Sequence, residues 1–142
     1  MDNRFYLCVF TCLFNKDLSK ILLFKKNREK EERYGSKWYN VGGKINFGEE
    51  SIDAALRELR EETGLILTKE NAKFIFVKED YRTFPNSHVG FFIYAARIEE
   101  TLNILLNGEL ESYQWFDVNK LPENVIDDIP LILRLYKNKL CE

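Results

Sequence analysis

Three glutamates, Glu58, Glu61 and Glu62, stand at positions i, i+3 and i+4 of one segment. In an α-helix such residues are neighbours, so this helix would gather three carboxylates within an arc of about 100°. Like charges so close resist ionising together, and a divalent cation removes that penalty. Arg57 could orient one of the carboxylates by charge-assisted hydrogen bonds. The pattern alone also fits a solvated surface helix with ordinary ion pairs, so the neighbouring sequence must decide.

The residues before this segment favour phosphate chemistry. Val41-Gly42-Gly43-Lys44 predicts a turn at which the backbone can approach a ligand or metal closely. Lys44 adds a cation suited to phosphate. Because Mg²⁺ takes oxygen ligands and keeps waters for a phosphorylated substrate, the two features together predict a metal-dependent phosphate site.

The stretch from Gly43 to Leu65 reads GKINFGEESIDAALRELREETGL. It matches the Nudix box, GX5EX7REUXEEXGU with U a bulky aliphatic residue, at every fixed position. The chain therefore resembles the Nudix hydrolases over essentially its whole length. Many relatives have proline where Val41 stands and glutamate where Asn46 stands, but neither is a fixed position of the box.

The resemblance implies an α/β/α sandwich with a mixed sheet, in which the box forms a loop, a helix and a loop. It also implies hydrolysis of a nucleoside diphosphate linked to another group, with Mg²⁺ or Mn²⁺ as the cofactor. The implied metal ligands are the carbonyl of Gly42 and the side chains of Glu58, Glu61 and Glu62. In MutT-type relatives the residue matching Glu58 is also proposed as the general base, oriented by the residue matching Arg57. Glu49 is expected to support the loop.

Relatives draw one more catalytic glutamate from outside the box, a few residues before a Trp-Phe or similar pair. Two glutamates, Glu109 and Glu111, precede Trp115 and Phe116 here. Glu109 is our first candidate for the metal site and Glu111 the second. An ordinary loop role stays open for either.

The C-terminal region resembles the MutT-like enzymes that remove oxidised nucleotides. Residues 115–122 read WFDVNKLP, and Asp127 and Asp128 follow before the last predicted helix. In those enzymes similar motifs occur in similar order, and the aspartates read an oxidised purine. The resemblance implies that Asp127, Asp128 and Trp115 bind substrate together with Lys44. The alternatives are that the aspartates cap the helix and that Trp115 packs in the core.

Strands and two helices are predicted around these residues. The expected strands are 4–14, 21–24, 73–81, 89–98 and 113–117, and the expected helices are 51–63 and 128–140. Residues 4–14 are apolar enough to be buried on both faces. Ser51 is expected to cap the first helix and Gly64 to end it. The charged segment 25–37 has no apolar stripe and is predicted to be an exposed loop.

The composition indicates one soluble domain over residues 1–142. The chain has 21 Lys and Arg against 23 Asp and Glu, with 45% hydrophobic residues. This balance disfavours disorder and strong nucleic-acid binding. The three cysteines have no disulfide-framework spacing, and no apolar run approaches the roughly 18–20 residues of a membrane span. We expect a cytoplasmic monomer or homodimer with no membrane partner.

We therefore expect a MutT-type nucleoside triphosphate pyrophosphohydrolase. Its substrate would be an oxidised purine deoxynucleoside triphosphate such as 8-oxo-dGTP, and its products the monophosphate and pyrophosphate. Hydrolysis of ADP-ribose, sugar nucleotides, dinucleoside polyphosphates or capped RNA stays open within the family. An inactive nucleotide-binding sensor of the same fold is disfavoured, because every box glutamate is present.

Overall fold

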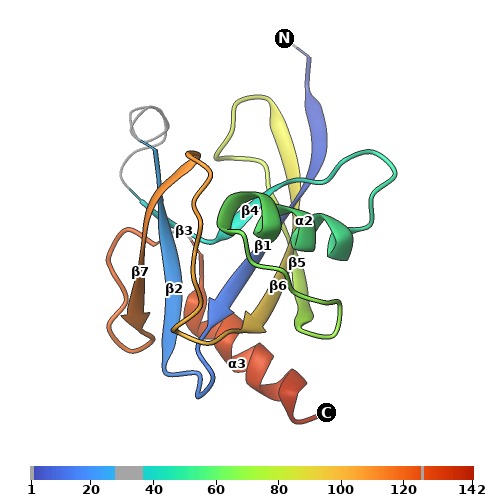
Figure 1. Ribbon diagram of the computed structural model, residues 1–142. Helices are drawn as coiled ribbons and strands as arrows, with labels where there is room; N and C mark the ends of the chain where they lie inside the picture. The colour runs from blue at the N-terminus through green and yellow to red at the C-terminus, as the bar shows by residue number, and fades with distance from the viewer. Residues whose placement is uncertain (1, 28–36, 126) are drawn as a thin grey trace.

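The computed structural model describes residues 2–27, 37–125 and 127–142. Its elements in chain order are β1 (Arg4–Phe14), β2 (Lys20–Lys26), β3 (Trp38–Tyr39), β4 (Val41–Lys44), α2 (Ser51–Thr63), β5 (Ala72–Asp80), β6 (Ser87–Arg97), β7 (Leu110–Asp117) and α3 (Ile129–Leu140) (Figure 1). All the predicted strands and helices are present, and β7 begins three residues before its predicted start. The predicted loop at 25–37 lies mostly outside the described residues, and its first two residues instead end β2.

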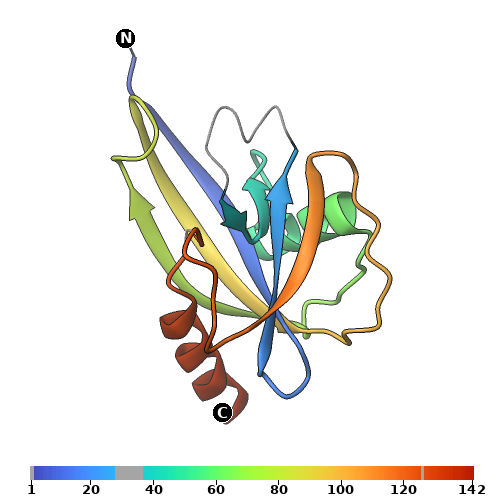
Figure 2. The same cartoon turned by 90° about the vertical axis from the view of Figure 1, so that its left-hand side faces the viewer.

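The strands form a seven-stranded mixed sheet that divides around β1. Among the strand pairs described, only β1 and β6 run parallel, and they pair along their whole length. The other edge of β1 is shared: β2 pairs with it at Leu13 and Phe14, and β4 pairs with it from Cys8 to Thr11. The arm of β2 and β7 therefore diverges from the arm of β1, β6 and β5, and β3 and β4 lie between them (Figure 2).

The two helices cover opposite faces of the sheet, which confirms the predicted α/β/α sandwich. Alternate residues of β1 point to opposite faces. Val9 packs in a cluster with Ala54 and Ala55 of α2. Phe14 lies in a second cluster with Tyr136 of α3, and their rings stack 5.8 Å apart. None of the helices in the described residues is long and apolar enough to cross a membrane.

Burial of β1 on both faces holds for only part of the strand. The residues from Val9 to Phe14 are buried, whereas Phe5 is 78% exposed and Leu7 49% exposed. The difference follows from the helices, because the residues of α2 and α3 pack against the C-terminal part of the strand.

Both helix boundaries were predicted well, but one cap was wrong. Glu50, not Ser51, is the N-cap of α2, and it makes no side-chain capping bond. The hydroxyl of Ser51 lies 2.7 Å from that of Tyr94, so a contact with the sheet takes the group that was expected to cap. Gly64 ends α2 in the left-handed region at φ 75°, where glycine has no Cβ penalty.

The segment from Val41 to Lys44 is a strand and not the predicted turn. Its glycines are needed for close packing. A Cβ on Gly42 would collide with the carbonyl oxygen of Val9, and a Cβ on Gly43 would lie 2.5 Å from Oε1 of Glu58. The glycines therefore let β4 pack closely against β1 and against Glu58 of α2, and the predicted approach of this backbone to a ligand or metal stays a prediction.

Candidate active site

The three glutamates of α2 lie in three different environments. Glu62 is 5% exposed, the side chain of Glu58 is 12% exposed, and that of Glu61 is 51% exposed. Glu58 lies against Gly43 of β4, and Glu61 lies at the solvent edge of the helix. The helical spacing thus brings the carboxylates to one side of α2, while the neighbouring strand decides how deeply each is buried.

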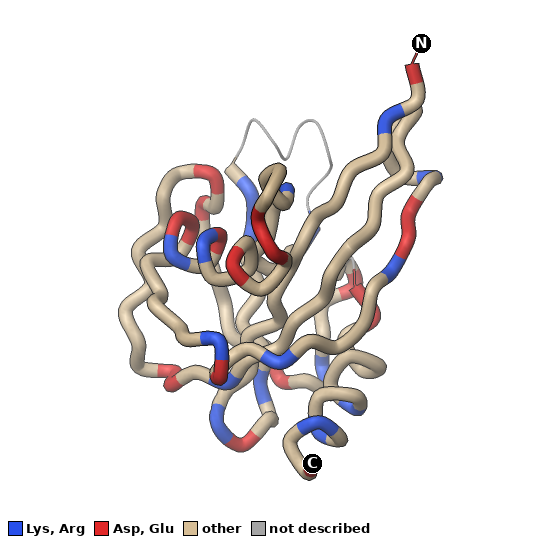
Figure 3. Tube along the Cα trace, turned by 90° about the vertical axis from the view of Figure 1, so that its right-hand side faces the viewer, with Lys and Arg blue, Asp and Glu red and all other residues tan. Residues whose placement is uncertain are grey.

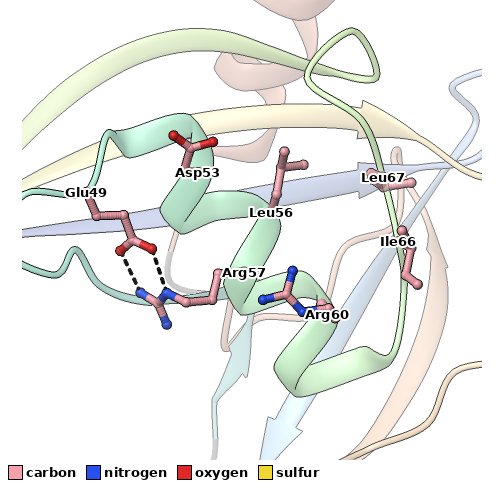
Figure 4. Close-up of a pocket in the computed structure, with 7 residues that line it drawn as sticks. All are labelled: Glu49, Asp53, Leu56, Arg57, Arg60, Ile66 and Leu67. Atoms are coloured by element: carbon pink, nitrogen blue, oxygen red, sulfur yellow. Dashed lines mark hydrogen bonds and ion pairs between the residues drawn. The ribbon is translucent and has the colours of Figure 1, made fainter.

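Arg57 connects two of these glutamates to the loop before the helix. Its Nε and Nη2 donate to the two carboxylate oxygens of Glu49 at 2.8 and 3.0 Å (Figure 4). Its Nη1 donates to Glu58 at 2.9 Å and to Glu61 at 3.2 Å. Its Nη2 also donates to the carbonyl oxygen of Lys44 at 3.0 Å. One guanidinium therefore fixes the loop, the end of β4 and two carboxylates together.

Glu49 holds Arg57 in position with an ionised carboxylate that is itself fixed to the loop. Its Oε1 also accepts a hydrogen bond from the backbone N–H of Asn46 at 3.0 Å. The bonds from Arg57 and from this N–H lower the pKa of Glu49, so it stays ionised. The contacts of Glu49 are thus to the loop and to Arg57.

Glu62 lines a cavity of about 20 Å³ at the point where the sheet divides. The residues around it are Lys26, Asn40, Gly42, Glu62, Glu109 and Leu110. The Oε2 atom of Glu62 is buried and has no hydrogen-bond partner among the described residues. Burial and the negative charges of Glu58 and Glu109 raise the pKa of Glu62 from its ordinary 4.5 to about 8. An unsatisfied buried carboxylate is costly, and a divalent cation would satisfy it.

The donor set around this cavity fits a hard cation. Glu62 and Glu109 have carboxylate oxygens, and Gly42, which has only backbone atoms, belongs to the same lining. Within residues 2–27, 37–125 and 127–142, however, no three Asp, Glu, His or Cys side chains already converge closely enough to hold a metal ion. Glu58 and Glu61 instead accept hydrogen bonds from Arg57. Each carboxylate has further lone pairs, so a cation could share them with Arg57.

The structure separates the two glutamates outside the box. Glu109 lines the cavity with Glu62, and its charge contributes to the raised pKa of Glu62. Glu111 is exposed on β7 and does not line the cavity.

The two aspartates before α3 are also separated. Asp128 is the N-cap of α3, and its side chain accepts a hydrogen bond from the N–H of Leu131 at 3.3 Å. The side chain of Asp127 is instead only 9% exposed, accepts from Nδ2 of Asn40 at 2.8 Å and lies 3.9 Å from Nζ of Lys78. Burial raises the pKa of Asp127, and Asn40 and Lys78 act in the opposite direction. The cap alternative therefore describes Asp128 and does not describe Asp127.

The other two substrate-binding candidates do not reach Asp127 in this structure. Lys44 places Nζ 4.7 Å from the centre of the Tyr6 ring. Trp115 packs against the core cluster that contains Leu22 and Leu59, on the side of the sheet that α2 covers. The packing alternative therefore describes Trp115.

Two residues of the cavity, Lys26 and Asn40, were not identified from the sequence. Lys26 is the last residue of the apolar strand β2. Its position in the cavity depends on the divergence of β2 from β1, which the sequence does not indicate. Asn40 stands between a Trp-Tyr pair and Val-Gly-Gly. The one signal in the sequence was a lone amide directly before the Val-Gly-Gly-Lys segment, where a phosphate or metal site was predicted.

A wider groove of about 350 Å³ runs along the outer side of α2. Its lining residues are Glu49, Asp53, Leu56, Arg57, Arg60, Ile66 and Leu67 (Figure 4). It shares only Glu49 and Arg57 with the residues discussed above and contains neither Glu58 nor Glu62. We therefore place the candidate active site at the small cavity.

Comparison with known proteins agrees with this geometry. Residues 5–135 match the model of the NUDIX domain. The chain is 30% identical over 116 residues to the uncharacterized Nudix hydrolase YvcI of Bacillus subtilis, covering 80% of this chain and 67% of that protein. It is 28% identical over 143 residues to the RNA pyrophosphohydrolase of Bartonella quintana, covering 84% and 80%. The m7GpppN-mRNA hydrolase of Saccharomyces cerevisiae is 28% identical over 115 residues, or 80% of this chain, but the match spans only 11% of that protein.

Solved structures share the same fold. The MutT protein of Methanosarcina mazei superposes with a TM-score of 0.77 at 18% identity, covering 98% of each chain. The MutT NUDIX hydrolase of Burkholderia pseudomallei gives 0.75 at 21% identity, covering 94% of this chain and 98% of that one. Because the family model covers most of the sequence and its box forms the helix that carries Glu58 and Glu62, this chain belongs to the Nudix family.

Proposed function

We propose that this Nudix protein is a hydrolase that uses a divalent cation, Mg²⁺ or Mn²⁺, to cleave a phosphoanhydride bond of a nucleotide. The observation that carries the proposal is the buried, unpartnered Oε2 of Glu62 in a cavity that Gly42 and Glu109 also line. A cation held there would supply charge neutralisation at the phosphates and a more acidic attacking water. The specific ligands that we propose are the carbonyl oxygen of Gly42 and the carboxylates of Glu58, Glu61, Glu62 and Glu109.

The residues of the chain would position the reactants around that cation. Glu58 has one oxygen held by Arg57, so its carboxylate is oriented and can accept a proton from the attacking water as the general base. Lys26 at the end of β2 and Lys44 at the end of β4 offer positive charge for the phosphates. The products from a nucleoside triphosphate would be the monophosphate and pyrophosphate.

For the substrate we propose an oxidised purine deoxynucleoside triphosphate such as 8-oxo-dGTP. Asp127 supports this choice, because it is a buried carboxylate that could distinguish the two purines. Oxidation at C8 turns purine N7 from an acceptor into a donor, and an ionised carboxylate only accepts. A buried site of this kind discriminates strongly, since the wrong base leaves a polar group unpaired.

A second candidate is hydrolysis at the 5′ end of RNA. It is favoured by the relatives, which include an RNA pyrophosphohydrolase and an mRNA-decapping hydrolase. Basic and acidic residues are interspersed along the described chain (Figure 3), which favours a small nucleotide over a long polynucleotide. A panel of nucleotides and a 5′-triphosphate RNA with Mg²⁺, scored for pyrophosphate and orthophosphate release, separates the candidates.

Glu62→Gln should keep the fold and lower turnover at least about 10-fold, because it removes an anionic ligand with little change in volume. Even residues that only support metal ligands commonly contribute 10–100-fold. Steady-state rates with Mg²⁺, together with circular dichroism of both proteins, measure the effect. A wild-type rate in the folded variant would show that the site assignment is wrong.

Metal affinity should rise with pH. In the metal-free protein the pKa of Glu62 is about 8, so this carboxyl holds a proton at neutral pH that a cation must displace. The apparent affinity for Mn²⁺ should therefore increase by up to about tenfold per pH unit below that value, with release of close to one proton. Calorimetric titration in buffers of different ionisation enthalpy counts the protons. Glu62→Gln is the control and should lose this dependence, and a flat profile in the wild type would contradict it.

Glu109→Gln should slow turnover more than Glu111→Gln, because only Glu109 lines the cavity. The two substitutions are matched in chemistry and lie two residues apart, so kcat under saturating Mg²⁺ compares them directly. The reverse ranking would assign the role to Glu111, and two equal mild effects would make both of them loop residues.

Asp127→Asn should change the ratio of kcat/KM between 8-oxo-dGTP and dGTP, because Asp127 is the buried aspartate of the pair. Asp128→Ala should leave that ratio unchanged and lower the free energy of unfolding by about 0.5–2 kcal/mol, as loss of an N-cap does. Kinetics and urea unfolding of both variants test whether Asp127 recognises the base and Asp128 only caps the helix. An unaltered ratio in Asp127→Asn would remove the aspartates from base recognition.

A further inference from the structure

Asn40 has a buried atom that its present contacts leave unsatisfied. The residue is 9% exposed and lies between β3 and β4. Its Nδ2 donates to Oδ2 of Asp127 at 2.8 Å, whereas its Oδ1 is buried with no partner among the described residues. A buried acceptor without a donor is destabilising, because it has lost its hydrogen bonds to water. Such an atom in a native structure calls for an explanation, such as a site for an ion.

Asp127 determines which way the amide of Asn40 points. The two ends of an amide have nearly the same shape, so its hydrogen bonds decide its orientation. Oδ2 of Asp127 is the acceptor in the hydrogen bond from Nδ2 of Asn40, and the ammonium of Lys78 lies 3.9 Å from Oδ1 of the same carboxyl group. Asn40 must therefore offer Nδ2 to Asp127, and this places Oδ1 on the other side of the amide.

Asn40 lines the same small cavity as Glu62, whose Oε2 is also buried and unpartnered. About 20 Å³ is room for one ion or one water molecule. Amide, carboxylate and backbone carbonyl oxygens are the donors that hard divalent cations take. The ammonium of Lys26, which also lines the cavity, lies over the Tyr39 ring at 4.4 Å from its centre.

We propose that Oδ1 of Asn40 is an additional oxygen donor to the divalent cation, directly or through one of its waters, and that Asp127 is the positioning residue that aims it. The proposal rests on the cation site assigned above to Glu62. It extends that site beyond the box and beyond the two carboxylates of the cavity. It also gives Asp127 a task that is independent of the base of the substrate.

Binding of Mn²⁺ to the nucleotide-free protein, followed by the electron paramagnetic resonance signal of free Mn²⁺, tests the proposal without turnover. Asn40→Leu, of similar size, should weaken binding about 10-fold or more, in the range known for residues around metal sites. Asp127→Leu should weaken it as well. Asp127→Asn should stay within about threefold of the wild type, because its amide oxygen can still accept from Asn40. Asp128→Ala is the matched control and should bind Mn²⁺ normally.

The double variant Asn40→Leu/Asp127→Leu separates positioning from a general loss of structure. It removes both polar partners together, which leaves neither unpaired and so favours folding. If Asp127 acts only through Asn40, the double variant should bind Mn²⁺ as weakly as Asn40→Leu alone. Independent, multiplying losses in affinity would contradict the positioning role.

Glu62→Gln distinguishes failure of this inference from failure of the cation site. Weakened Mn²⁺ binding in Glu62→Gln with normal binding in Asn40→Leu would make Asn40 purely structural, while the site itself stands. A lower unfolding temperature in Asn40→Leu with unchanged affinity would lead to the same conclusion. Normal binding in both variants would overturn the site and the inference together.

Discussion

The burial of Glu62 where the sheet divides is the constraint on which the rest of the site depends. A carboxylate at 5% exposure, beside two other acidic side chains, resists ionisation, and its pKa rises to about 8. The protein must therefore hold it in place by packing and not by ion pairing. Leu59, on the same helix, is fully buried against the sheet, and Gly43 leaves room for the approach of α2. The stability of the core thus holds an electrostatically unfavourable group in position.

Arg57 offsets the repulsion between Glu58 and Glu61, the two glutamates of α2 that are more exposed to solvent than Glu62. Without a cation, Glu58 and Glu61 would repel each other across one turn of α2. The guanidinium binds both and is itself fixed by the two oxygens of Glu49. Because the bidentate contact ties Arg57 to the loop before α2, the positions of the loop and of Glu58 are coupled. The geometry around Glu58 is therefore set before any ligand arrives, which limits the reorganisation that binding requires.

The local patterns of the sequence predicted the elements, and long-range contacts explain most of what they missed. The apolar stripe of α2 and Gly64 gave both ends of that helix, since these signals act within a few residues. The role of Ser51 depended on Tyr94, which lies on a strand much later in the chain, and no local rule contains that contact. Gly42 and Gly43 were predicted to let the backbone approach a ligand or metal, and in the structure they allow close packing against β1 and Glu58. Their secondary structure was wrong because pairing with β1, and not a turn, brings the backbones together.

In the candidate site, too, local spacing predicted some residues and long-range contacts brought in the others. The fixed spacing of the box placed Glu58 and Glu62 on one side of α2, because a helix converts spacing directly into position. Asn40 and Lys26 join them only because β2 and β4 share one edge of β1 and then diverge. Asp127 accepts a hydrogen bond from Asn40, which directly precedes β4, whereas the neighbouring Asp128 only caps α3. Two adjacent identical residues thus have different environments. A resemblance in motif order indicated both aspartates, but only the contacts of each side chain distinguish Asp128, which caps a helix, from Asp127, which binds a residue of the cavity.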